Sequence, residues 1–193
     1  MHKIFKTLSH DIGIFFNEYF IIPFFIAIFI TLICIMILAV RKKKENPLHY
    51  VKIFVAMFYF SELFYTTLIH RIGMKTEPLA DVFGEWSVYD GETIMYINPK
   101  PILNILLFLP ICFAVFYILK SFLNKTFSNK KIILLTLSIS FLTSLAIELI
   151  QLIFCIGTFQ LSDLVYNTLG GLIGAIIYIT VKKIINKKQH RLS

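Results

Sequence analysis

The stretch Ser140–Tyr178 reads SFLTSLAIELIQLIFCIGTFQLSDLVYNTLGGLIGAIIY and predicts two apolar helices joined by a short polar turn. Polar and small residues recur in each helix at steps of three and four, which places them on one helical face; they are Ser140, Ser144, Glu148, Gln151 and Cys155, then Asp163, Asn167, Gly170, Gly174 and Tyr178. A carboxylate in hydrocarbon costs roughly 2.5–3.5 kcal/mol on insertion scales. We therefore expect Glu148 to face a partner, water or a ligand.

The whole chain has the composition of a membrane protein. Of its 193 residues 58% are hydrophobic and 16% charged, which favours a polytopic helical membrane protein over a soluble domain. The formal charge of +8 comes from short lysine and arginine runs beside apolar segments, a pattern of membrane topology rather than of nucleic-acid binding. The three cysteines lie inside predicted spans and no Cys/His spacing indicates a metal site, so we predict no disulfide, metal or cofactor.

Five apolar segments are long enough to cross a hydrocarbon core of roughly 30 Å. The expected fold is all-α, a bundle of five transmembrane helices at 20–40, 51–70, 102–122, 132–156 and 164–185. Pro110 is expected to kink the third helix. We divide the chain into an extracytoplasmic or interfacial segment (1–19), the transmembrane domain (20–185) with its extracytoplasmic loop (71–100), and a basic cytoplasmic tail (186–193).

The distribution of lysines predicts the orientation. Segments 41–52, 120–131 and 182–191 are lysine-rich and should be cytoplasmic, whereas the loop 71–100 holds more acids than bases and should be outside. Five spans satisfy every loop with the N-terminus outside and the C-terminus in the cytoplasm. We therefore expect a multi-pass protein of the bacterial cytoplasmic membrane.

With that orientation, four helices place polar side chains in the outer half of the membrane. Glu148 and Glu62 should each lie about 12 Å below the outer helix ends. We predict one polar cavity in the outer half, with Glu62 at its floor, surrounded by Glu148, Gln151, Asp163, Asn167, Asn104 and Arg71. Each amide can equally well join helix to helix, and Asp163 can equally well cap the fifth helix.

The glycines of the fifth helix predict close helix packing. Gly170, Gly171 and Gly174 include a GxxxG spacing, which lets two membrane helices approach each other. We expect the face that holds Gly170 and Gly174 to lie against the fourth helix.

Three blocks of residues resemble the VanZ-like membrane proteins. They are TLIHR at 67–71, NILLFLP at 104–110, and the segment 144–174, which carries E-x-x-Q and then D-x-x-x-N-x-x-G-G-x-x-G. The sequence departs from the family where Cys112 replaces a glycine, and where the turn 157–160 lacks an arginine. The resemblance implies an association with resistance to glycopeptide antibiotics, notably teicoplanin.

Three functions compete on these observations. A non-enzymatic envelope protein would bind an amphiphile, either a membrane lipid, a lipid-linked cell-wall component or a lipoglycopeptide antibiotic, or would alter the outer-leaflet surface. A membrane enzyme would act on a lipid-linked intermediate with Glu148 or Asp163 as the acid-base group. A proton-coupled carrier is disfavoured, because five spans show no repeat. The lack of a nucleophile motif or phosphate loop favours the non-enzymatic protein.

Overall fold

The computed structural model describes residues 20–40, 46–74, 76–79, 81–83, 87–90, 93–97, 99–123 and 127–192. Its helices are α2 (Ile21–Val40), α3 (Pro47–Thr67), the short 3-10 helix η2 (Ile69–Arg71), α4 (Lys100–Phe108), α5 (Ile111–Leu123), α6 (Asn129–Phe154) and α7 (Leu161–Leu192). Five helical segments in the described residues are long and apolar enough to cross a membrane. The five-helix fold is therefore confirmed, and this is a multi-pass membrane protein. The predicted segment 1–19 lies outside the described residues.

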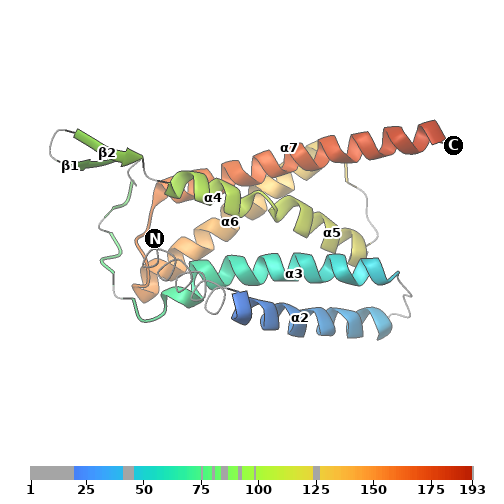
Figure 1. Cartoon of the computed structure of the whole chain (residues 1–193), viewed down its shortest axis with the longest axis horizontal. Coiled ribbons are helices and arrows are strands. Elements are labelled where there is room, and N and C mark those ends of the chain that lie inside the picture. The colour runs from blue at the N-terminus through green and yellow to red at the C-terminus, as the bar shows by residue number, and fades with distance from the viewer. Residues whose placement is uncertain are drawn as a thin grey trace, which may run out of the picture.

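A small hairpin lies in the loop between η2 and α4, where the sequence predicted no regular structure. Strands β1 (Ser87–Asp90) and β2 (Thr93–Ile97) pair in an antiparallel register, with an irregularity after Val88. The hairpin projects beyond one end of the bundle (Figure 1). The predicted all-α fold is therefore confirmed for the membrane-spanning bundle, and the loop adds a two-stranded hairpin.

Helix α7 packs against three other helices. It contacts α6, α4 and α5, whereas α3 contacts α5 and η2 on one side and α2 on the other. Figure 1 shows α2 and α3 side by side, with α2 at the edge of the bundle and the end of α5 against α3. Residues of α7 therefore lie close to both α4 and α6.

Pro110 divides the third span into α4 and α5, as predicted. Proline has no backbone N–H and cannot continue the helical hydrogen-bond ladder. The hydroxyl of Tyr59 on α3 donates to the carbonyl oxygen of Leu107 at this break, at 3.0 Å. The neighbouring helix therefore satisfies a backbone acceptor at the point where the third span bends.

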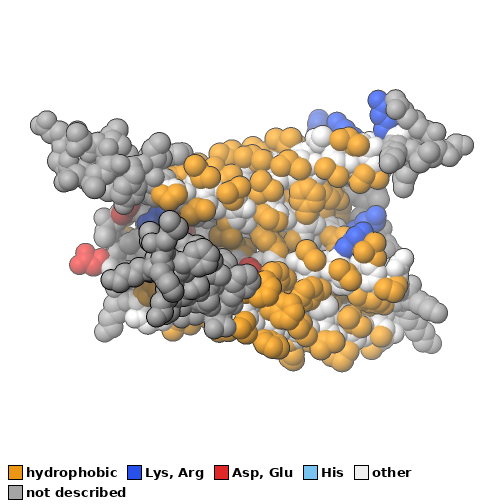
Figure 2. Space-filling view, in the orientation of Figure 1, with side chains coloured by type: hydrophobic (Ala, Val, Ile, Leu, Met, Phe, Trp, Pro, Cys, Tyr) orange, Lys and Arg blue, Asp and Glu red, His pale blue; other side chains and the backbone are white. Residues whose placement is uncertain are grey.

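The two ends of the bundle differ in chemistry. We call the end with η2, the α6–α7 turn (155–160) and the start of α4 the loop end, and the opposite end, with the lysine-rich part of α7, the basic end. Hydrophobic side chains cover the middle of the face shown in Figure 2, and several Lys and Arg side chains gather toward the end of α7. Apolar side chains such as Phe29 (66% exposed) point outward, as expected where lipid surrounds the helices.

Candidate functional site

Glu148 on α6 is buried at the loop end. Its side chain is 2% exposed, and its Oε2 atom accepts a hydrogen bond of 2.8 Å from the backbone N–H of Gln160. The other carboxylate oxygen accepts no hydrogen bond from the described residues. Helix α6 ends at Cys155, which has the left-handed φ of 53°, so the chain turns back and brings Gln160 over the carboxylate. Glu148 therefore faces a polar partner in the protein, the backbone N–H of Gln160.

A segment of the loop after η2 covers this turn. We call it the strap, residues 76–79 and 81–83. Backbone hydrogen bonds tie it to the turn; they run from Thr76 N–H to the Cys155 carbonyl, from Phe159 N–H to Pro78, and from Leu161 N–H to Val82. The side chain of Gln160 also donates to Asp81 Oδ2 at 2.6 Å. Gln160 therefore holds the buried carboxylate with its backbone and the strap with its side chain.

Gln151 joins α6 to the end of the second span, and Arg71 lies beside the α6–α7 turn. Gln151 is 3% exposed and donates from Nε2 to the Thr67 carbonyl at 2.8 Å. A β-carbon built at Gly157 would lie 2.7 Å from Gln151 Oε1 and 2.9 Å from Arg71 Nη1. The turn can therefore pass these two side chains because residue 157 is glycine.

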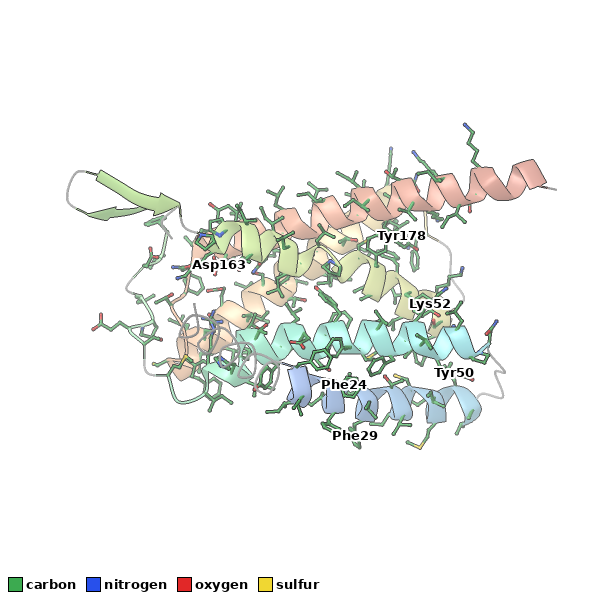
Figure 3. The ribbon with its side chains drawn as sticks, in the orientation of Figure 1. Phe24, Phe29, Tyr50, Lys52, Asp163 and Tyr178 are labelled. Atoms are coloured by element: carbon green, nitrogen blue, oxygen red, sulfur yellow. The ribbon has the colours of Figure 1, made fainter. Side chains whose placement is uncertain are left out.

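Asp163 forms the second carboxylate of the site, in the first turn of α7 (Figure 3). The side-chain amide of Asn104 on α4 is its hydrogen-bonding neighbour, and the positive charges of Lys100 and Arg71 act on it. Glu148 lies within electrostatic range of both Asp163, which repels it, and Arg71, which attracts it. Within the described residues, the Arg71 guanidinium forms no ion pair with either carboxylate.

Polar side chains continue from Glu148 toward the middle of the bundle. Asn167 on α7 is 5% exposed and donates from Nδ2 to Ser144 Oγ at 2.8 Å. Deeper still, the Thr136 hydroxyl contacts Cys112 Sγ at 3.3 Å. We call the buried α6 face the polar row; its members are Thr136, Ser140, Ser144, Glu148 and Gln151. Ser140 Oγ and Asn167 Oδ1 are buried and have no hydrogen-bond partner among the described residues.

The glycines of α7 face two neighbours rather than one. A β-carbon at Gly170 or Gly174 would collide with the carbonyl oxygens of Ile105 and Leu109, respectively, which belong to the third span. A β-carbon at Gly171 would collide with Ser140 on α6. The sequence predicted that Gly170 and Gly174 lie against the fourth span, which is α6. That prediction is wrong: these two glycines lie against the third span, and Gly171 lies against α6.

The described geometry brings six of the seven predicted cavity residues to the loop end. Asn167 joins them through Ser144, one turn of α6 below Glu148. The seventh, Glu62, is partly exposed on α3, and its carboxylate makes no hydrogen bond or ion pair within the described residues. Its predicted place at the floor of a cavity therefore has no contact that supports it.

Sequence reasoning missed Gln160 and Asp81. Nothing in their spacing marked them, since Gln160 lies in an irregular turn and Asp81 in the long loop, and the two are 79 positions apart in the chain. Among the described residues, no three His, Cys, Asp or Glu side chains form a group that suits a metal ion.

The comparison with known families agrees with this architecture. The VanZ/LLP1 family model matches residues 24–183, a range that holds the second, third and fourth spans, most of the first and fifth, and the carboxylates of Glu148 and Asp163. No curated protein and no solved structure matches the chain. The match covers most of the sequence, and the protein therefore belongs to the VanZ/LLP1 family of membrane proteins.

Proposed function

We propose that this protein is a non-enzymatic membrane protein of the bacterial envelope that binds the head of an amphiphile at the loop end. Binding would lower susceptibility to glycopeptide or lipoglycopeptide antibiotics of the teicoplanin type. Membership of the VanZ family supports the association with glycopeptide resistance. The observation that carries the proposal is the Glu148 carboxylate, which is buried inside the bundle and accepts one hydrogen bond, from the backbone N–H of Gln160. A buried carboxylate in a membrane helix is a functional candidate by default.

The interior of the bundle favours binding over passage. The polar row ends near Cys112, which belongs to an apolar cluster with Phe116, Ile132, Ala175 and Ile179. The ring of Tyr178 stacks on Phe116 at a centroid distance of 5.7 Å and adds to that cluster. A polar group that enters from the loop end would therefore meet apolar packing before it reached the basic end, which suits a binding protein better than a carrier.

A membrane enzyme is the second candidate, since Glu148 and Asp163 lie within electrostatic range of each other. Two carboxylates in one site can divide the roles of acid and base. Neither carboxylate makes a hydrogen bond to a histidine or cysteine in the described part of the chain. A turnover assay separates this candidate from the first.

The orientation is part of the proposal, because the ligand must reach the loop end from outside the cell. Single cysteines at positions 46, 85 and 128, in a variant without the three native cysteines, report the topology. An impermeant thiol reagent on intact cells should label position 85 and leave the other two unlabelled. Labelling of position 46 or 128 would contradict the orientation.

The direct test uses the purified protein in lipid nanodiscs with a labelled lipid-linked cell-wall precursor and a labelled lipoglycopeptide. We expect saturable binding of at least one of them, no chemical change in either, and loss of binding in Glu148→Gln. Glu62→Gln is the matched control. Glu62 is also an intramembrane glutamate, but within the described residues it makes no hydrogen bond or ion pair, so this variant should bind normally. Product formation would favour the enzyme, and absence of saturable binding would contradict the proposal.

A further inference from the structure

We propose that the basic end of the bundle binds the head groups of anionic phospholipids. This surface lies at the opposite end from Glu148 and is separate from the site of the proposed function. Lysines of three helices gather there, beside apolar side chains that are exposed on α7.

These lysines surround one apolar cluster. Leu119 of α5, Ile132 of α6 and Ile179 of α7 pack together in that cluster. Each of the three is adjacent to a lysine or one helical turn away from one; the lysines are Lys120 on α5, Lys130 and Lys131 on α6, and Lys182 and Lys183 on α7. Because the cluster residues pack against one another, lysines that are far apart in the chain lie at the same end of the bundle.

The helical turns that carry these lysines hold positive charge without acidic side chains. Within the residues that the structure describes, the last turn of α5, the first turn of α6 and residues 181–187 of α7 contain no Asp or Glu. Lys120, Lys130 and Lys183 are exposed. Lys131 Nζ lies 5.5 Å from the centroid of the Phe127 ring, which places it at the edge of the apolar cluster. The charge of this surface therefore favours an anionic partner.

The end of α7 is amphipathic, which identifies the anion as a lipid. Lys182 and Lys183 follow Ile179 by three and four residues, so they lie on the helical face that packs in the cluster. The opposite face exposes large apolar side chains: Val181 is 40%, Ile184 63% and Ile185 52% exposed. A free phosphate ion would leave these side chains uncovered. A phospholipid supplies both the anionic head and the apolar chains that this part of α7 requires.

Helix α7 is long enough to bring these lysines to the membrane surface. Its 32 residues span about 48 Å, and a hydrocarbon core of roughly 30 Å takes up about 20 of them. The helix continues past the other helices at the basic end (Figure 1). The topology of a membrane protein requires lysines in such turns, but it does not require them on one face of a helix. The arrangement on α7 therefore indicates lipid binding in addition to orientation.

The test uses the full-length protein in phosphatidylcholine bilayers with spin-labelled phosphatidylglycerol or phosphatidylcholine. Electron paramagnetic resonance gives the association constant of each lipid with the protein. At low salt we expect phosphatidylglycerol to associate about fivefold more strongly, the contribution of one lysine near a charged membrane surface, or more. Lys182→Gln/Lys183→Gln should remove most of this preference. Lys182→Arg/Lys183→Arg is the matched control, since it keeps both charges at the same positions and should keep the preference.

Two further measurements on the wild-type protein need no folded variant. The preference should largely disappear at about 1 M salt, where the screening length falls to roughly 3 Å. Glycerol phosphate, the same head without its chains, should not release the lipid at millimolar concentration.

Three results would overturn the proposal. They are an equal association of the two lipids with the wild type, a wild-type preference in Lys182→Gln/Lys183→Gln, and a preference that survives high salt. Release of the lipid by glycerol phosphate would identify a free phosphate as the occupant and would also contradict it. Glu148→Gln should keep the lipid preference, because Glu148 lies at the loop end, so failure of the proposed function would leave this result unchanged.

Discussion

The loop-end half and the basic-end half of the α6–α7 interface are built from the same two helices but differ in chemistry. Toward the loop end, the interface buries Glu148, Ser144 and Asn167, and leaves polar atoms without partners in the described structure. Toward the basic end, it is joined by the apolar cluster that contains Phe116 and Ile132. Apolar burial stabilises a fold, whereas unpartnered buried oxygens destabilise it. The difference is consistent with the proposed function, in which the basic-end half maintains the bundle and the loop-end half binds the ligand.

The largest loss of folded protein should follow from a change in Gly170 or Gly174, the two glycines that pack α7 against the third span. In Gly170→Leu, the new side chain would collide with the backbone carbonyl of Ile105, which cannot rotate away. We expect little or no monodisperse protein after detergent extraction, measured by fluorescence-detected gel filtration. Ile176→Leu is the control, because Ile176 is 52% exposed on the same helix, and its yield should be normal. A normal yield for Gly170→Leu would contradict the close packing.

A smaller effect, confined to stability, should follow from a change in the basic-end half. Phe116 is 3% exposed and stacks on Tyr178, so Phe116→Ala should destabilise the fold by about 3–5 kcal/mol. The variant should still bind the labelled amphiphile that the wild-type protein binds, at temperatures where it is folded. Phe29→Ala removes an outward-facing ring of the same size and should change the unfolding midpoint far less. Loss of binding in folded Phe116→Ala would show that the two halves are not separable.

The smallest effect should be local to the strap. Asp81→Ala removes the acceptor for the Gln160 side chain, a loss of about 1 kcal/mol. The amides of Phe159 and Leu161, which bond to strap carbonyls, should then exchange with deuterium about fivefold faster. Glu77→Ala is the control, since Glu77 is an exposed acid of the same strap. Equal exchange in the two variants would show that the Asp81–Gln160 bond does not hold the strap.

The five-helix fold could be predicted because lipid imposes simple rules. Apolar length predicted each span, and the break at Pro110 followed from the missing N–H. The partner of the glycine face could not be predicted in the same way. Gly170 and Gly171 are adjacent in sequence but point to different helices, and the choice between α4 and α6 depends on how all five helices pack.

Residues of the candidate site could be predicted where they follow the periodicity of a single helix. Glu148, Gln151 and Asn167 were predicted by helical spacing, together with the cost of placing them in lipid. The bonds from Gln160 to Glu148 and to Asp81 depend on the path of an irregular turn and a long loop, for which there is no comparable rule. Glu62 was predicted from its depth in the membrane. That depth does not determine whether its side of α3 faces Glu148.

The central claim is that the Glu148 carboxylate binds the ligand and is not needed for the fold. The most direct measurement is the teicoplanin susceptibility of isogenic bacteria that express the wild-type protein, Glu148→Gln or Glu62→Gln at equal membrane levels. Glutamine keeps the size of the side chain and can still accept the Gln160 N–H bond, but it removes the charge. We predict that Glu148→Gln accumulates normally and gives the susceptibility of cells without the protein, while Glu62→Gln behaves as the wild type. Full protection by Glu148→Gln would contradict the claim.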